Sequence, residues 1–345
     1  MGPFVFPDPV IDAREEDLLI SLTRDYQKFT SPGFISKGTR AAGNGIAKLT
    51  PERFKSGFSD AVGRVNEWEL IKRALEYAGK GFVELTKHAS RFTLSGDAVV
   101  ECLNASGCCV DQFEQVCAVR SYDIEKLLSK RNYGDIIAAL VEGAATGAPG
   151  LFGVPFNIAL SFFLFFRAVQ GTGLFYGYDV KGDPRELELA SQITITCLSP
   201  NSDDGTKNLG GLLGKMMFAS NATALRQSLS KKTYTEMAKG GGAELLYVQI
   251  RALANKAAQK ALKNAGKEPL EAGMFRQILE QIGRLLPQKA GKQAIPLIGA
   301  IVGGLSDTYY MSRILHGSNL IYHKRFLFEK EYRVNILSET SSTLE

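Results

Sequence analysis

Residues 142–179 read EGAATGAPGLFGVPFNIALSFFLFFRAVQGTGLFYGYD, and this stretch decides the fold. It holds no charged side chain between Glu142 and Arg167. Small residues, glycines and two prolines come first, a dense apolar run over 158–166 follows, and aromatic residues with glycine end it. Glycines inside apolar stretches let neighbouring helices approach closely. The stretch therefore predicts an apolar helical hairpin at the centre of the protein.

A second stretch, residues 294–326, repeats this arrangement and reads AIPLIGAIVGGLSDTYYMSRILHGSNLIYHKRF. Both stretches begin with proline among small apolar residues and pass through glycines. Each then reaches an arginine, Arg167 in the first and Arg313 in the second. The similarity indicates a weak internal repeat of two Gly-rich helical hairpins. The alternative is that any two buried helices share these features.

Signals for β-strands are scarce along the chain. No stretch alternates convincingly between apolar and polar residues, and no Asn-Gly or Asp-Gly turn joins two β-rich runs. We therefore predict an all-α fold, a large multi-helix bundle with two Gly/Pro-rich apolar helical hairpins. Residues 1–50 are expected to form an N-terminal helix and a flexible loop, residues 51–335 a helical domain, and residues 336–345 a disordered tail.

Helix starts are marked by capping residues and by proline in the first turn. Asp12 precedes the first amphipathic segment, and Asp183-Pro184 opens a later one. The polar residues 199–208 form the clearest mid-chain boundary. Helices are expected over residues 12–30, 50–92 with breaks, 93–131, 183–198, 209–230, 234–239, 243–264, 269–286, 293–315 and from there to about 332.

Composition limits the classes of function. The chain has 345 residues, of which 22% are charged, and a net charge of +5. This charge permits contact with anionic surfaces but is far below the basic density of a dedicated nucleic-acid binder. We therefore expect no nucleic-acid partner. The first ten residues lack the basic region and long apolar core of a secretory signal, so a reducing cytoplasm is the expected location.

Cysteines are concentrated between Cys102 and Cys117, where Cys108 and Cys109 also lie, and Cys197 stands apart. Structural zinc sites favour cysteine pairs with two to four residues between them, and these spacings do not match. We interpret the cluster as buried free thiols, with a redox or metal role as the alternative. No metal site and no cofactor is predicted.

Catalytic patterns are missing from the sequence. His88, His316 and His323 belong to no catalytic motif. Two glycine-rich stretches, 171–177 and 210–215, are similar to nucleotide-binding loops but depart from the required spacing or residues. No nucleophile or general base accompanies the carboxylates. Whether the protein is an enzyme is therefore left open, with a non-enzymatic role favoured.

Two aspartates differ from the others because they lie beside the apolar stretches. Asp179 closes the first stretch, and Asp307 lies among apolar residues in the second. Asp179 could cap the following helix or pair with Arg167, and Asp307 could form a buried contact with Arg313. Structural pairing is favoured over catalysis.

The chain resembles the EcsC family of bacterial proteins. The resemblance is carried by GAPGLFGVPFNIALSFFLFFRAVQGTGLFYGYD, by the Asp-Pro-Arg-Glu-Leu-Glu run at 183–188, and by IPLIGAIVGGLSDTYYMSRI near the C-terminus. It covers roughly residues 70–332 and is strongest in the two Gly/Pro segments; the cysteine cluster and the loop at 199–208 depart from the family pattern. The resemblance implies an all-helical protein, cytoplasmic or membrane-associated, and the family is named for a gene beside an ABC transporter. It implies no catalytic residues.

Membrane affinity is the sharpest hypothesis that the sequence supports. The uncharged run 143–166 has the length of a membrane span, but Pro155 and Asn157 interrupt it. We therefore favour a hairpin buried in the resting bundle, and the alternative is a hairpin that inserts into a bilayer. The residues expected to contact lipid in that event are Leu151, Phe152, Phe156, Phe162, Phe163, Phe165, Phe166, Ile298 and Ile301.

Basic residues could hold such a protein against an anionic membrane face. The clearest set is Lys256, Lys260, Lys263 and Lys267, and further basic residues follow it, namely Arg284, Lys289, Lys292, Lys324 and Arg325. A solvated helix face is the competing interpretation.

Three functions remain open at this point. The first is a membrane-associating helical protein that docks on or inserts into bacterial membranes, including as a toxin or effector delivered to another cell. The second is a lipid-handling or hydrolytic enzyme with an apolar pocket lined by Phe162, Phe163, Phe165, Tyr176 and Tyr178. The third is a soluble interaction scaffold. The expected partners are a membrane surface or lipid, a membrane protein, or a second copy of the chain.

Overall fold

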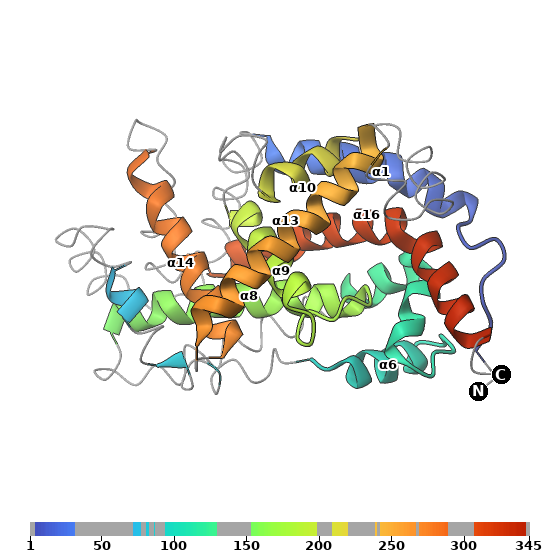
Figure 1. Ribbon diagram of the computed structural model, residues 1–345, viewed down its shortest axis with the longest axis horizontal. Helices are drawn as coiled ribbons and strands as arrows, with labels where there is room; N and C mark the ends of the chain where they lie inside the picture. Colours follow the sequence, from blue (N-terminus) through green and yellow to red (C-terminus); the bar gives the residue numbers. More distant parts are fainter. Residues whose placement is uncertain are drawn as a thin grey trace, which may run out of the picture.

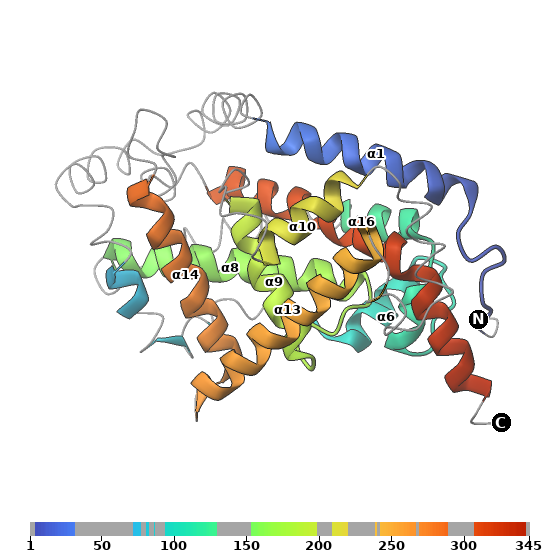
Figure 2. The same cartoon turned by 45° about the horizontal axis from the view of Figure 1, so that its top comes forward.

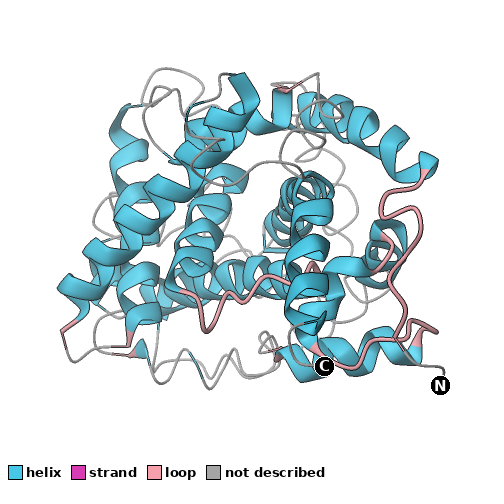
Figure 3. Cartoon of the chain, turned by 45° about the vertical axis from the view of Figure 1, so that its right-hand side comes forward, coloured by secondary structure: helices cyan, strands magenta, loops and turns pink. Residues whose placement is uncertain are grey.

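A computed structural model describes residues 4–31, 72–76, 81–82, 86, 94–129, 153–198, 209–219, 239, 242–266, 269–288 and 307–342. These residues form helices, turns and loops, and none of them lies in a strand (Figure 3). The all-α prediction is therefore confirmed. The first halves of the two predicted hairpins, 142–152 and 294–306, lie outside the described residues.

The described elements follow the chain in a simple order. They are α1 (Ala13–Thr30), α6 (Gly96–Ala105), the 3₁₀ helix η2 (Phe113–Ala118), a helix over residues 121–129, α8 (Gly153–Phe175), α9 (Pro184–Leu198), α10 (Leu209–Phe218), α13 (Gly242–Ala265), α14 (Leu270–Gln288) and α16 (Asp307–Ser342).

Helix α16 forms the centre of the arrangement (Figure 1). It packs against α1, α8, α9 and η2, which belong to widely separated parts of the sequence. Between Tyr310 and Lys330 nearly every side chain is buried, with Ser312 and His316 exposed. A helix that is buried on all sides belongs to the core. Helices α1, α8, α9, α10 and η2 therefore surround the buried part of α16.

Two groups of helices cover this centre. Helix α1 runs along one side and also packs against α10, while α13 and α14 form a pair that packs on α9 (Figure 2). The α1 start was predicted correctly: Asp12 accepts a hydrogen bond from the Glu15 backbone N–H, and the Glu15 side chain returns to the Asp12 backbone N–H. This capping box satisfies two amides that a helix N-terminus otherwise leaves unpaired.

The turn between α8 and α9 depends on glycine. Gly177 has φ +71°, a left-handed conformation that side chains other than glycine rarely adopt. At Gly173 an added Cβ would lie 2.9 Å from the Tyr322 ring of α16, so the glycine permits the close contact of α8 with α16. The Asp183-Pro184 start predicted for α9 is present, and Asp183 Oδ1 accepts a hydrogen bond from the Arg185 backbone N–H.

Several predicted boundaries are wrong. The predicted break near residue 315 does not occur, because α16 continues through Gly317 and ends at Ser342; residues 336–342, assigned to the disordered tail, are therefore helical. The single helix expected over 93–131 is divided at Gly107, whose φ of +98° ends α6. Helix α10 ends at Phe218, earlier than the predicted residue 230.

The phenylalanines of α8 are core residues in this structure. Phe162, Phe163 and Phe166 are 0% exposed and Phe165 is 1% exposed. The Phe163 ring makes edge contacts with Phe275 of α14, at 5.1 Å between ring centroids, and with Phe82, at 5.4 Å. No helix in the described part of the chain combines the length and the apolar character that a bilayer crossing requires. The prediction of a buried hairpin in the resting fold agrees with these contacts for the α8 half.

The burial of α8 leads to a stability prediction. Phe162→Ala removes a ring that is 0% exposed and should lower the free energy of unfolding by about 3–5 kcal/mol. Urea denaturation followed by circular dichroism measures it. The matched control is Ile20→Ala on α1, because Ile20 is 61% exposed and its truncation should change stability by less than about 0.5 kcal/mol. Equal effects of the two variants would contradict the core position of α8.

Candidate functional site

Charged side chains that are buried gather along α16, and they are the most unusual chemical feature of the described residues. Arg313, Lys324, Arg325, Glu329 and Lys330 are each at most 4% exposed. Buried charges are rare in proteins unless they are paired, and clusters of them mark candidate functional sites. Each of these charges has partners from other segments of the chain or from its own helix.

The first cluster joins α1 to the C-terminal half of α16. Glu15 and Lys330 are both 0% exposed, and the Lys330 ammonium donates to both carboxylate oxygens of Glu15, at 2.7 and 3.0 Å. Arg120 donates to the same carboxylate at 3.0 Å, and the Ser121 backbone N–H donates at 2.8 Å. Burial lowers the pKa of Lys330, and Glu15 opposes that shift. One carboxylate thus serves two cations from two other segments.

The second cluster joins α9 and the α8–α9 turn to α16. Arg325 forms a bidentate ion pair with Glu186, at 2.6 and 2.8 Å, and donates to Glu329 at 2.8 Å. The Tyr178 ring lies close to two guanidinium groups, 3.9 Å from Arg325 and 4.5 Å from Arg333. Burial alone would lower the pKa of Arg325, but the two carboxylates raise it well above its usual value. Arg325 therefore stays charged, and this cluster is a network of buried ion pairs.

Arg167 is buried and paired, but its partner is not the predicted one. Its guanidinium lies 2.7 Å from Glu271 of α14, and Gln170 donates to the same carboxylate at 3.0 Å. Asp179 is exposed and accepts hydrogen bonds from the backbone N–H groups of Lys181 and Gly182. The predicted Arg167–Asp179 pair is therefore wrong, because Asp179 shapes the turn after α8 instead.

Arg313, the corresponding residue of the second stretch, is also buried. Its Nε donates to the Cys197 carbonyl of α9 at 3.0 Å, and its guanidinium lies 4.3 Å from the Phe29 ring centroid of α1. Asp307 begins α16, and its side chain lies outside the described residues. The arginine therefore contacts a backbone carbonyl and an aromatic ring from two neighbouring helices.

Lys324 differs from the other buried cations because neutral oxygens surround it. Its ammonium donates to Thr23 Oγ1 of α1 and to the Met217 carbonyl at the end of α10, and the Ala219 carbonyl lies at 3.5 Å. Among the described residues no carboxylate lies within ion-pair distance of it. Burial lowers the pKa of Lys324 from 10.5 to about 8.

His323 is a buried histidine that lies near a carboxylate. It is 0% exposed, stacks on Tyr176 at 5.5 Å between ring centroids, and places Nδ1 4.0 Å from Glu125 Oε2. Burial, with a smaller effect of Lys330, lowers its pKa to about 3. The ring is therefore neutral near pH 7 and is buried away from solvent, which does not suit a general acid or base.

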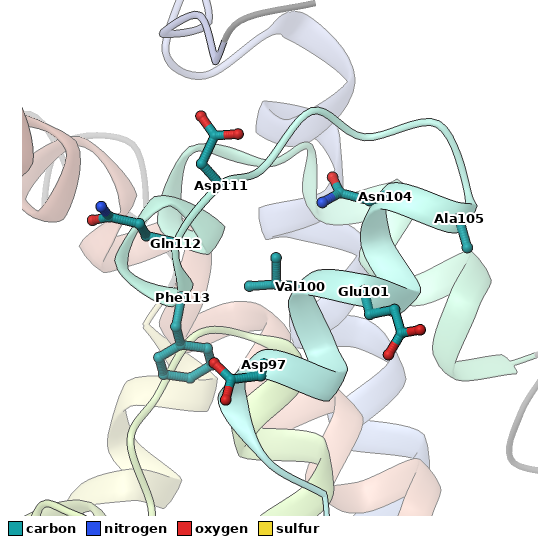
Figure 4. Close-up of a pocket in the computed structure, with 8 residues that line it drawn as sticks. All are labelled: Asp97, Val100, Glu101, Asn104, Ala105, Asp111, Gln112 and Phe113. Atoms are coloured by element: carbon teal, nitrogen blue, oxygen red, sulfur yellow. The ribbon is translucent and has the colours of Figure 1, made fainter. Parts of the chain in front are cut away.

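One open cavity of about 600 Å³ lies beside α6 and η2 (Figure 4). The carboxylates of Asp97, Glu101 and Asp111 stand around it, and Phe113 lies at its side. The Asn104 side chain is occupied by two hydrogen bonds with the Val110 backbone. The cavity is therefore acidic and open, and its lining includes no serine, threonine, cysteine, lysine or histidine. It is not the apolar pocket expected for a lipid-handling enzyme, whose predicted lining residues instead fill the core, from Phe162 to Tyr178.

The cysteines are free, as expected, but only Cys117 of the cluster predicted to be buried is in fact buried. Cys117 and Cys197 are buried, Cys102 and Cys108 are partly buried, and Cys109 is exposed. Burial raises the pKa of Cys117 and raises that of Cys197 to about 12, which keeps both thiols protonated and unreactive. No group of three or more His, Cys, Asp or Glu residues in the described ranges is arranged to hold a metal ion.

The basic residues divide into two sets that the sequence did not separate. Lys256, Lys260 and Lys263 are exposed on one face of α13, as predicted. Lys324 and Arg325, which were grouped with them, are buried and belong to the core. Lys267 and the lipid-contact candidates Leu151, Phe152, Ile298 and Ile301 lie outside the described residues, and so does the side chain of Phe156.

Sequence reasoning missed the partners of the buried cations, namely Glu15, Glu186, Glu271 and Glu329. Each lies in an amphipathic or charged segment where a carboxylate reads as a solvated side chain. The position of Glu15 in a capping box indicates a local role at the start of α1, but it does not predict the contact with Lys330. Only the packing of distant helices brings these groups together.

The depressed pKa of Lys324 predicts a pH dependence. The folded state releases its proton near pH 8 and the unfolded chain near 10.5, so the unfolded chain binds more protons between these values and stability rises with pH there. Wild type should gain up to about 3 kcal/mol relative to Lys324→Met as pH increases from 7 to 10.5. Urea denaturation at several pH values measures the difference. Lys126→Met is the control, since Lys126 is exposed; parallel curves for wild type and Lys324→Met would contradict the prediction.

Comparison with known proteins places the chain in a family. The model of the EcsC protein family matches residues 19–327, which is most of the chain. Neither the search of curated proteins nor that of solved structures found a match.

Proposed function

Because the chain belongs to the EcsC family, we propose that it is a membrane-associating protein that docks on an anionic membrane face through the exposed basic face of α13. The observation that carries the proposal is the position of Lys256, Lys260 and Lys263. Residues spaced by four and three positions lie on one side of a helix, so the three ammonium groups can approach a flat surface together. We call this set the α13 basic face.

The surroundings of the α13 basic face support contact with a membrane. None of the ion pairs found among the described residues uses these three lysines, so their charge is available to a partner. Leu262 is 50% exposed but lies on another side of the helix from the three lysines, since residues one or two positions apart do not share a face. Contact through the α13 basic face is therefore electrostatic.

The proposed mode is docking, because the apolar side chains of α8 that would insert into a bilayer are packed in the core of the protein. The α8 phenylalanines pack against α14 and against each other, and Arg167 of the same helix pairs with Glu271. Withdrawing α8 from the core would expose these rings and separate a buried ion pair, which costs several kcal/mol. Insertion as a toxin or effector therefore requires a larger rearrangement than docking does.

The proposal predicts a charge-specific loss of binding. The triple variant Lys256→Gln, Lys260→Gln, Lys263→Gln should bind vesicles of phosphatidylserine and phosphatidylcholine on the order of a hundredfold more weakly, because each lysine near an anionic surface contributes about 1 kcal/mol. Co-sedimentation measures this. The matched control changes Lys72, Lys126 and Lys239 to glutamine, which removes the same charge from other exposed positions.

The outcomes separate the alternatives. Equal binding by the two triple variants would contradict the role of the α13 basic face, and no binding by wild type would favour the interaction scaffold. Release of a dye trapped in the vesicles would favour the inserting toxin or effector over docking. Binding to pure phosphatidylcholine that equals binding to the mixture would contradict the electrostatic mechanism.

A further inference from the structure

Helix α1 covers a row of cations on α16. Its contacts run antiparallel to α16: Glu15 meets Lys330, Thr23 meets Lys324, and Phe29 meets Arg313. We call Arg313, Lys324 and Lys330 the covered cations, and each is at most 4% exposed. A single carboxylate of α1, Glu15, lies among these contacts, and Lys330 shares it with Arg120. Helix α1 therefore supplies fewer negative charges to this contact than α16 supplies positive ones.

Lys324 makes this contact weaker than an apolar one of the same area. An ammonium held by neutral oxygens has lost its hydration without gaining a counter-charge, and this loss opposes burial. Removal of α1 would return the Lys324 ammonium to water, while the carbonyls of Met217 and Ala219, at and just after the end of α10, would remain beside it. The apolar contacts of Leu19, Leu22, Tyr26 and Phe29, together with the buried pair of Glu15 and Lys330, hold α1 in place against this penalty.

Helix α1 is also placed at the edge of the fold. It packs on α16 and α10, and nothing in the described residues covers its outer side, where Asp17, Ile20 and Arg24 are exposed (Figure 2). Phe29 fits over Gly317 of α16, where an added Cβ would lie 2.6 Å from the ring. If α1 moved away from α16, the covered cations would become exposed together with the surface around Gly317 on which Phe29 packs.

We infer that α1 is a releasable cover that competes with an anionic membrane for the covered cations of α16. The inference rests on the proposed function and adds its regulation. With α1 closed, the protein presents only the α13 basic face; with α1 open, three further cations and an apolar face become available to anionic lipid. A surface that binds the open state more tightly shifts the population toward that state. Binding and opening of α1 are then linked.

Hydrogen–deuterium exchange on the full chain tests this linkage. In the presence of equimolar phosphatidylserine and phosphatidylcholine vesicles, the α1 amides between Leu18 and Phe29 should exchange roughly tenfold faster. Amides of the buried part of α9 should be unchanged, which serves as the internal control. Vesicles of phosphatidylcholine alone should leave α1 protected.

Two variants loosen the cover by different routes. Glu15→Gln leaves Lys330 and Arg120 without their carboxylate, and Thr23→Val removes an acceptor from Lys324 at nearly constant volume. Each should bind the mixed vesicles roughly tenfold more tightly than wild type. The matched control is Asp17→Asn, which changes the same charge on the exposed side of α1 and should bind as wild type does. Circular dichroism confirms folding, and Thr23→Val carries the test if Glu15→Gln does not fold.

The results distinguish the inference from the proposed function. Wild-type binding with unchanged or slowed α1 exchange, or variants that bind no better than Asp17→Asn, would overturn the cover while leaving docking through α13 intact. Failure of wild type and of both variants to bind any vesicle would overturn the two proposals together. Faster α1 exchange with tighter binding of the loosened variants supports the cover.

Discussion

The burial of charged side chains along α16 constrains the rest of the structure. An ammonium or guanidinium group removed from water must find oxygens at hydrogen-bond distance, because an unpaired buried charge costs several kcal/mol. Lys330, Arg325 and Arg313 meet this requirement with groups from α1, α9 and residues far away in sequence. The positions of the surrounding helices are therefore coupled to the central one by specific contacts as well as by apolar packing.

These contacts differ in strength. Arg325 and Glu186 form a bidentate pair that joins α9 firmly to α16. Helix α1 is joined to α16 by one buried pair, Glu15 with Lys330, and by the contact of Thr23 with Lys324, which finds only neutral oxygens. Pairs between charged groups are the stronger of the two kinds of contact. Within the contact of α1 with α16, the region around Lys324 is therefore the weaker one.

The proposed docking and the proposed cover both depend on two separate sets of cations, one on the surface of α13 and one buried on α16. The lysines of the α13 basic face are exposed, and the covered cations are buried beneath α1. The acidic cavity beside α6 lies in another part of the molecule and would repel the same lipid headgroups. Such a distribution of charge orients a protein on an anionic surface.

Local patterns in the sequence determined the helical class, the start of α1 at Asp12, the start of α9 after Asp183, and the exposed lysines of α13. These features depend on neighbours a few residues apart, where capping, proline and helical spacing act. The burial of the α8 apolar run was also favoured from its length and its interrupting proline. The two Gly/Pro segments carried the resemblance to the EcsC family, and the family model matches residues 19–327.

Only the tertiary structure decided which charges are buried and what pairs with them. Lys324 and Arg325 look like surface residues in the sequence, yet the packing of helices around every side of α16 buries both. Arg167 pairs with Glu271, more than a hundred residues away, in place of the nearby Asp179. The continuation of α16 through Gly317 has the same origin, because α1 and α9 close around that glycine. A sequence pattern reports local preference, whereas the desolvation of a charge depends on every chain segment that surrounds it.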